Sequence, residues 1–228
     1  TDDQQNPFGK RFVRRAISWL YRIGTAHLEG IMFQNHDDIE LFGAQALMPR
    51  NLPSLVVRGS GVDVERYIQS PARVDPLRFV FIARLLSYKG VREFAAAAAL
   101  LKQTHPHVVC SIVGPFDPNP SGITSREMNM WQEQGIIRYE GATDDVRPFL
   151  DACSVYVLPS YYREGTPRTV LEAMSIGRPI ITADTPGCRE TIFDLAQANT
   201  MGVRRGRNGF LVPPRSVEAL TAAMRCFV

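Results

Sequence analysis

Two acidic residues, Glu164 and Glu172, are separated by seven residues in the segment REGTPRTVLEAM. A carboxylate is a poor ligand for a phosphate group, but it accepts hydrogen bonds well from paired hydroxyl groups. The residues after Glu164 predict a turn and then a helix, with Thr166 as the N-cap and Pro167 as the first helical residue. One carboxylate is therefore expected just before a helix and the other inside it.

The start of that predicted helix is a candidate anion site. Its first N–H groups, from Arg168, Thr169 and Val170, have no partner within the helix and face the turn that contains Gly165. N–H groups that can bind phosphate would then lie between two carboxylates that can accept hydrogen bonds from hydroxyl groups. This arrangement suits a ligand with a central diphosphate and a sugar at each end, as in a nucleotide-sugar. An ordinary helix with a solvated glutamate has the same spacing, so spacing alone leaves both interpretations open.

A second segment, FIARLLSYKG (81–90), favours the nucleotide-sugar interpretation. It predicts a strand followed by the start of a helix, and it places Arg84 and Lys89 just beyond the strand. Two cations at this position could neutralise a diphosphate and the charge that develops when it leaves. The sequence contains no Asp-x-Asp triplet, so we expect no metal ion to be required.

The elements that must position these residues are alternating strands and helices. Short β-rich runs are expected at 30–35, 54–59, 77–84, 107–114, 135–141, 154–160, 179–184 and 209–214. Helical stretches lie between most of them, for example at 89–105, 144–153, 167–177 and 216–227. Strands that are apolar on both faces and alternate with helices predict an α/β fold with a doubly wound, Rossmann-like parallel sheet. Ligands of such sheets bind beyond the carboxyl ends of the strands.

A change in composition near QSPARVDP (69–76) predicts a domain boundary. Residues 73–228 contain a complete six-strand unit, which we expect to bind the nucleotide-sugar. Residues 1–72 contain too few elements for a second unit of that kind. We therefore expect them to be the last part of a domain whose beginning is absent, so that the chain is a fragment of a longer protein.

Bulk composition excludes several other classes of function. Lys and Arg outnumber Asp and Glu by only 26 to 23, which gives no support for nucleic-acid binding. No apolar run approaches the ~20 residues that a membrane span needs. The cysteines are scattered, which is typical of buried, reduced thiols in a cytoplasmic protein: Cys110, Cys153, Cys188 and Cys226.

Several segments together resemble the retaining family-four glycosyltransferases, which have the GT-B architecture of two Rossmann-like domains. In the family's order, the segments are VVRGSGVDVERY (56–67), FIARLLSYKG (81–90), the long run from Phe149 to Thr191, and NGFLVPP (208–214). The pattern EGTPRTVLE is the most specific of these. The resemblance covers almost the whole chain and implies that residues 1–72 belong to the acceptor-side domain.

The resemblance also implies roles for individual residues. Arg84 and Lys89 would hold the diphosphate, Glu164 would face the transferred sugar, and Glu172 would accept both ribose hydroxyls. The backbone at the helix start would contact sugar and phosphate, and the end of a strand would line the base. The residues at the helix start are Gly165, Thr166, Pro167 and Arg168. The strand end that would line the base is Tyr139 to Gly141.

The implied activity is retaining transfer of a sugar from a nucleotide-sugar, in which the leaving phosphate accepts the proton of the acceptor. The donor would be UDP-linked, with an N-acetylhexosamine as one choice of sugar. The acceptor would be a saccharide or a lipid-linked saccharide in polysaccharide biosynthesis. Two alternatives stay open, namely a non-catalytic nucleotide-sugar-binding module and another GT-B enzyme such as a nucleotide-sugar epimerase.

Two further segments raise questions about partners. The segment 194–209 carries Arg204, Arg205 and Arg207, and it could be a flexible solvated loop or could reach the donor phosphates. A helix predicted at 10–23 has an apolar face that includes Trp19 and Leu20 and a face with several arginines. It could pack on the rest of its domain or attract an anionic membrane surface, which would make the protein peripheral to the membrane.

Overall fold

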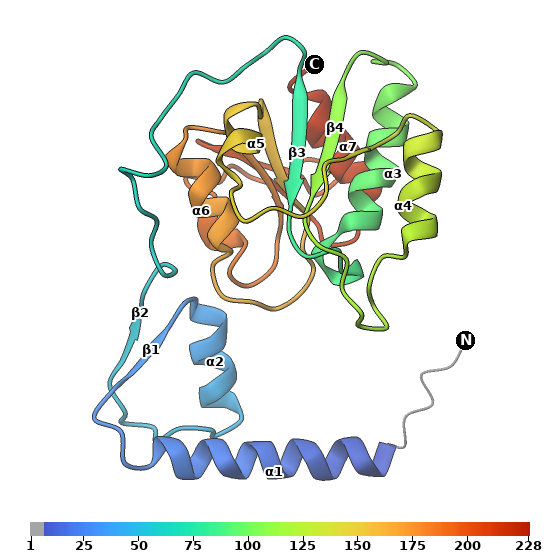
Figure 1. The fold of residues 1–228 in the computed structure, drawn as a ribbon. Coiled ribbons are helices and arrows are strands. Elements are labelled where there is room, and N and C mark those ends of the chain that lie inside the picture. The colour runs from blue at the N-terminus through green and yellow to red at the C-terminus, as the bar shows by residue number, and fades with distance from the viewer. Residues whose placement is uncertain (1–6) are drawn as a thin grey trace. The chain divides into compact units, whose positions relative to one another are not determined.

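The computed structural model describes residues 7–228, which divide into two units (Figure 1). The first unit ends at Arg58 and the second runs from Gly59 to Val228. Residues 59–72, which the sequence assigned to the first part, therefore belong with the second unit. The functional identities predicted for 1–72 and 73–228 stay predictions.

The first unit is a parallel pair of short strands with two helices. Its elements are α1 (Pro7–Thr25), β1 (Ile31–Phe33), α2 (His36–Ala44) and β2 (Ser54–Val56). Edge-to-face aromatic contacts join them, because the Phe42 ring lies 5.1 Å from the rings of both Tyr21 and Phe33. Arg22 of α1 donates from Nε to the carbonyl oxygen of Ala46 at 3.0 Å. No helix in the described range is long and apolar enough to cross a membrane.

The second unit is built on a seven-stranded sheet in the order β5-β4-β3-β6-β7-β9-β8. Its strands are β3 (Arg78–Ile82), β4 (Val109–Val113), β5 (Arg138–Tyr139), β6 (Val155–Leu158), β7 (Ile180–Ala183), β8 (Arg204–Gly206) and β9 (Gly209–Val212). All neighbours pair in parallel except β8 with β9. If β8 is left aside, the order is that of a doubly wound Rossmann sheet, which confirms the predicted fold class.

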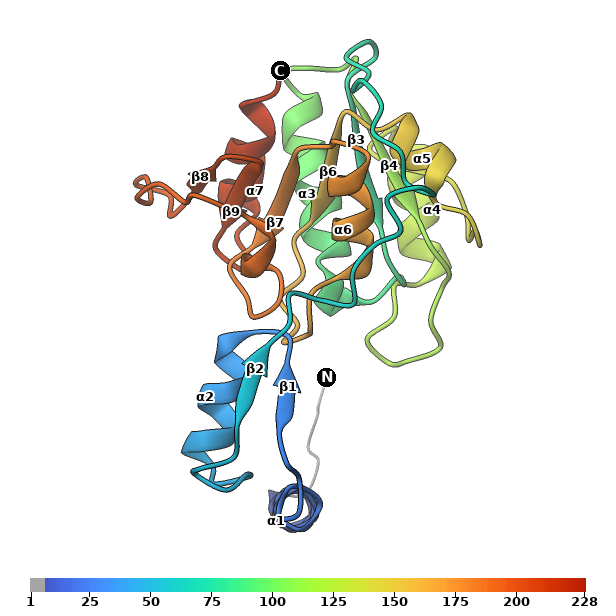
Figure 2. The same cartoon turned by 90° about the vertical axis from the view of Figure 1, so that its left-hand side faces the viewer.

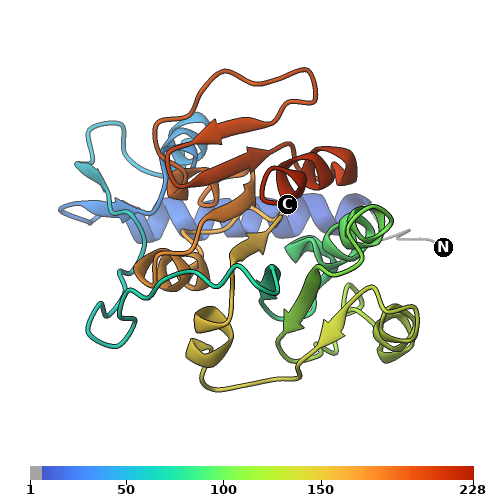
Figure 3. The same cartoon turned by 90° about the horizontal axis from the view of Figure 1, so that it is seen from above.

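Helices cover both faces of this sheet. They are α3 (Val91–Lys102), α4 (Ser125–Glu133), α5 (Arg147–Asp151), α6 (Arg168–Ser175) and α7 (Val217–Arg225), with short 3-10 turns η1 (Ser87–Lys89) and η2 (Arg189–Thr191). Figures 2 and 3 show α5 and α6 on one face and α3 and α7 on the other. The central strands are consequently buried on both faces, as in β6, where every residue is buried.

The segment that precedes β3 is attached to α6 and to the start of β7. Ser175 donates from Oγ to the carbonyl oxygen of Tyr67 at 2.7 Å. The guanidinium of Arg178, which is 2% exposed, donates to the carbonyl oxygens of Ser70 at 2.7 Å and of Leu150 at 2.9 Å. These hydrogen bonds explain why residues 59–72 belong with the second unit.

Three local predictions need correction. Helix α6 begins at Arg168 with Pro167 as its N-cap, one residue later than expected, and Thr166 is not the cap. Segment 194–209 is not simply a flexible loop, because Arg204 and Arg205 form the antiparallel edge strand β8. Three of the cysteines are buried, but Cys226 is exposed.

Candidate functional site

Most of the predicted site residues follow β3 and β6, which are neighbours in the middle of the sheet. From β3 the chain continues in one direction along the sheet, through β4 to β5, whereas from β6 it continues in the other, through β7 to β9. Loops diverge at such a switch point, and their divergence leaves room for a ligand at the carboxyl ends of the strands. Arg84 and Lys89 follow β3, and Glu164 follows β6.

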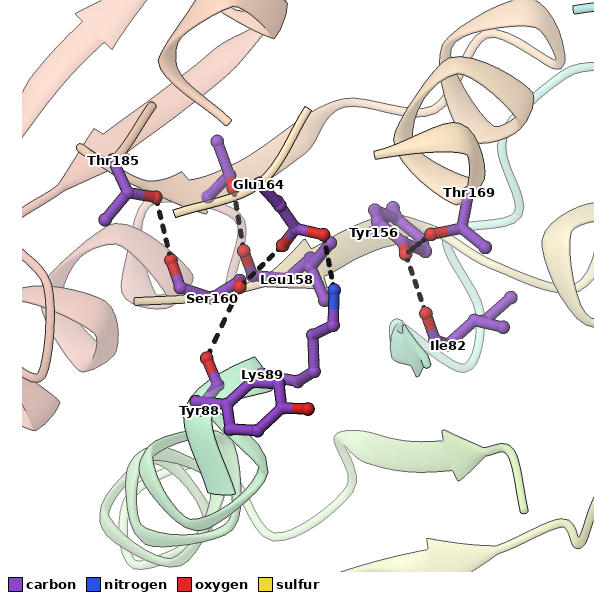
Figure 4. A network of polar contacts seen from close by, with 10 residues as sticks. Ile82, Tyr88, Lys89, Tyr156, Leu158, Ser160, Glu164, Thr169 and Thr185 are labelled. Carbon is purple, nitrogen blue, oxygen red and sulfur yellow. Dashed lines mark hydrogen bonds and ion pairs between the residues drawn. The ribbon is translucent and has the colours of Figure 1, made fainter. Parts of the chain in front are cut away.

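The centre of the site is an ion pair between Lys89 and Glu164 (Figure 4). Lys89 Nζ pairs with Glu164 Oε2, and the two side chains are only 15% and 16% exposed. The other carboxylate oxygen, Oε1, accepts a hydrogen bond of 2.7 Å from Ser160 Oγ. Glu164 is therefore held through both of its oxygens, one by a cation and one by a hydroxyl group.

Ser160 is itself fixed by the loop that follows β7. Its side chain is completely buried, and its carbonyl oxygen accepts a hydrogen bond of 2.9 Å from Thr185 Oγ1. The same loop approaches the glutamate closely at Gly187, which has a φ of 82°. A Cβ there would lie 2.3 Å from the carbonyl oxygen of Gly165, so only glycine allows this approach.

Helix α6 is anchored by Tyr156 of β6 (Figure 4). The buried Tyr156 hydroxyl donates to the carbonyl oxygen of Ile82, at the end of β3, at 3.1 Å. It also lies 2.7 Å from Thr169 Oγ1, in the first turn of α6, and Thr169 is the donor in that second hydrogen bond. The tyrosine thereby fixes the first turn of α6 against the strand end that leads to Arg84.

Glu172 lies one turn into α6 and is 5% exposed. Its Oε1 accepts a hydrogen bond of 3.1 Å from Arg168 Nε, one turn earlier on the same helix. Burial raises the pKa of Tyr67, and a hydrogen bond with Glu172 raises that pKa further. The second glutamate is therefore enclosed by a cation and a phenol.

Arg84 lies beside the ion pair in sequence but has another partner. It is 62% exposed at its side chain, and its Nη1 lies 3.0 Å from Asp117 Oδ2 in the loop after β4. The structure therefore brings Lys89 and Glu164 into contact and leaves Arg84 turned towards a different loop.

Tyr139 and Gly141 lie at the end of β5. The Tyr139 hydroxyl donates to the carbonyl oxygen of Gly114 at 2.9 Å, and its ring lies 5.3 Å from that of Phe116 in an edge-to-face contact. Gly141 has a φ of 84° and accepts a hydrogen bond from the N–H of Gly114 at 2.8 Å. This strand end contacts the loop after β4 that also contains Asp117.

A family model described as Glycosyl transferases group 1 matches residues 76–228, which is most of the second unit. The chain belongs to this family. An N-acetylgalactosaminyltransferase of Campylobacter jejuni, which acts on N,N'-diacetylbacillosaminyl-diphospho-undecaprenol, is 31% identical over 198 residues. The match covers 81% of this chain and 50% of that protein.

The chain is also similar to a second curated relative and, in fold, to solved structures. The putative colanic acid biosynthesis glycosyltransferase WcaL of Escherichia coli is 26% identical over 76% of this chain and 42% of its own length. HepE of Anabaena in complex with UDP has a TM-score of 0.71 at 19% identity, and the match covers 89% of this chain and 54% of that one. The chain thus spans about half the length of the relatives that it matches, and its fold is that of GT-B glycosyltransferases.

Three residues of this group 1 glycosyltransferase site were missed by sequence reasoning. Ser160 and Tyr156 lie in or beside β6, and Tyr67 lies at the end of the family-like segment 56–67. Buried strands are normally apolar, so a tyrosine and a serine in SVYVLPS were available signals. The segments with Arg204, Arg205 and Arg207 lie at the far edge of the sheet, beyond β9.

Proposed function

We propose that this chain binds the donor of a retaining glycosyltransferase that moves a sugar from a UDP-sugar to a saccharide or lipid-linked saccharide acceptor. The observation that carries the proposal is the Lys89–Glu164 pair at the switch point of the sheet, beside the first turn of α6. The proposal is supported by the chemistry of this region, because a cation suits phosphate, a carboxylate suits sugar hydroxyls and the N–H groups of a helix start suit an anion.

The remaining residues take roles that follow from their places. Arg84, which is exposed, supplements Lys89 at the diphosphate after leaving Asp117. Gly165, Thr166, Pro167 and Arg168 lead into α6 and supply backbone contacts to sugar and phosphate. Glu172 accepts the ribose hydroxyls, and Tyr139 to Gly141 line the base.

The reaction needs no group beyond these and the two substrates. The bond between the anomeric carbon and the phosphate oxygen breaks, and the acceptor oxygen bonds to the anomeric carbon on the same face. The acceptor proton passes to the departing phosphate oxygen. Lys89 and the start of α6 stabilise the negative charge that develops on that phosphate.

The relatives support the choice of partners. The Campylobacter relative is named for transferring N-acetylgalactosamine to an undecaprenol-linked sugar, and HepE was solved with UDP. We extend this to a UDP-N-acetylhexosamine donor and a lipid-linked acceptor for the present chain. Helix α1 exposes apolar side chains, such as Phe12, Trp19 and Leu20, and it also carries arginines. This combination would suit a peripheral contact with an anionic membrane on the cytoplasmic side.

Donor binding is proposed to need no divalent metal, because Lys89 and Arg84 carry the positive charge. Removal of metal ions by EDTA should leave the affinity for UDP unchanged in isothermal titration calorimetry. A large loss of affinity that Mg²⁺ or Mn²⁺ restores would show that a metal site is part of donor binding.

Product analysis tests the activity. The protein is incubated with UDP-linked hexoses and N-acetylhexosamines and with free or undecaprenol-linked saccharides, and the new glycosidic bond is examined by NMR. An axial donor sugar should remain axial in the product. An inverted product would refute retention, conversion of the UDP-sugar to an epimer would favour the epimerase, and binding without any transfer would favour the non-catalytic module.

A further inference from the structure

Lys89 and Glu164 form an ion pair with each other (Figure 4). The proposed function assigns them to different parts of the donor, Lys89 to the diphosphate and Glu164 to the sugar. Both side chains are largely buried, so neither charge is well solvated and the ion pair contributes to the compensation of both charges. This ion pair affects whether the site prefers UDP or a UDP-sugar, an inference that rests on the proposed function.

Free UDP must compete with Glu164 for Lys89. If the diphosphate takes the lysine, the Glu164 carboxylate loses this ion pair and lies close to two phosphate groups of the same sign. Breaking an ion pair in a largely buried site costs free energy. UDP alone must bind against this cost.

A UDP-sugar removes the penalty, because its sugar hydroxyls can donate to the oxygen that Lys89 leaves. The geometry identifies that oxygen as Oε2, since Oε1 keeps its 2.7 Å hydrogen bond from the buried Ser160 hydroxyl. Ser160 is in turn held by Thr185 at 2.9 Å, so the carboxylate stays in place during the exchange. Ser160 is thus a positioning residue for Glu164.

We propose that the Lys89–Glu164 ion pair makes the site selective for the nucleotide-sugar over the free nucleoside diphosphate. The pair opens when phosphate and sugar arrive together, and it re-forms when the sugar has been transferred. Re-formation withdraws Lys89 from the diphosphate and hastens the release of UDP. Glu164 is therefore a specificity-determining residue that opposes the binding of UDP alone.

The test is the affinity of the variant Glu164→Gln for UDP and for the tightest binder among UDP-glucose, UDP-N-acetylglucosamine and UDP-N-acetylgalactosamine. Glutamine keeps the shape and a hydrogen-bond acceptor but removes the charge. UDP should bind about three- to tenfold more tightly than to the wild type, because Lys89 is released. The preference for the UDP-sugar over UDP should shrink in the same variant.

A double-mutant cycle separates the ion pair from simple repulsion. Lys89→Met should weaken UDP binding, and adding Glu164→Gln in that background should no longer strengthen it. An equal gain in both backgrounds would show that Glu164 only repels the phosphates, and the proposal would fall. Unchanged or weaker UDP binding to Glu164→Gln would also overturn it, whereas failure of the wild type to bind any of these ligands would refute the proposed function itself.

Asp194→Asn is the matched control, since Asp194 pairs with Arg207 at 3.7 Å in another part of the second unit. Asparagine tolerates the positive φ of 53° at this position, so only a paired charge is lost. This variant should bind UDP like the wild type. Thermal melts of all variants identify any that fail to fold. Ser160→Ala gives a second test of how Glu164 is positioned, because this variant should reduce the preference for the UDP-sugar without strengthening UDP binding.

Discussion

At the scale of single residues, the two glutamates that share one sequence motif occupy different environments. Glu164 is held by a lysine and a serine from different loops, whereas Glu172 is enclosed by Arg168 of its own helix and by Tyr67. Both carboxylates are mostly buried, so each needs partners in the unliganded protein. Ligand hydroxyls must therefore replace or join existing partners.

Glu172→Ala should weaken UDP binding by about 10- to 100-fold, because Glu172 is proposed to accept hydrogen bonds from the ribose, which every form of the donor contains. A hydrogen bond to a charged group contributes roughly 1.5–3 kcal/mol. Calorimetry measures the affinity. Glu133→Ala, an exposed glutamate at the end of α4, is the control and should change nothing. If Glu172→Ala binds UDP normally but melts at a much lower temperature, Glu172 is a structural residue.

At the scale of elements, the sequence predicted the strands, their parallel arrangement and the loops that carry the charges. Strands β3, β4 and β6 are continuous apolar runs, and such runs are recognisable without a structure. The start of α6 was misplaced by one residue, because proline can occupy either the N-cap or the first helical position. Edge strand β8 is polar and short, and its pairing with β9 depends on a chain reversal that composition does not encode.

The links between elements were the part that sequence could not supply. The Lys89–Glu164 pair joins residues 75 positions apart, and the Ser160–Thr185 bond joins residues 25 apart. Each depends on the order of strands in the sheet, which hydrophobic patterns leave undetermined. The position of Arg84 next to Asp117 is a similar case, because the sequence does not show that the loops after β3 and β4 approach each other.

Arg178→Met tests the attachment of the segment before β3. The substitution removes hydrogen bonds to Ser70 and Leu150 and leaves buried carbonyl oxygens without donors, so the free energy of unfolding should fall by about 2–3 kcal/mol. Urea unfolding measures the change. The exposed Arg225, substituted in the same way, should have little effect, and an equally small effect of Arg178→Met would show that this attachment contributes little.

At the scale of the whole molecule, every residue proposed to bind the donor lies in the second unit. The same unit contains the match to the group 1 glycosyltransferases, at residues 76–228. We therefore propose that donor recognition is a property of residues 59–228. The first unit offers the exposed apolar and basic side chains of α1, whose role in acceptor or membrane contact is a separate question.

Titration of the chain with UDP, GDP and ADP tests the central claim most directly, because the claim is that the second unit binds a uridine diphosphate. Isothermal titration calorimetry should show UDP binding at one site, with GDP and ADP weaker. The heat should be lost in Lys89→Met at concentrations that saturate the wild type. No binding of any of the three nucleotides at millimolar concentration would contradict the assignment of the β3–β6 switch point as a donor site.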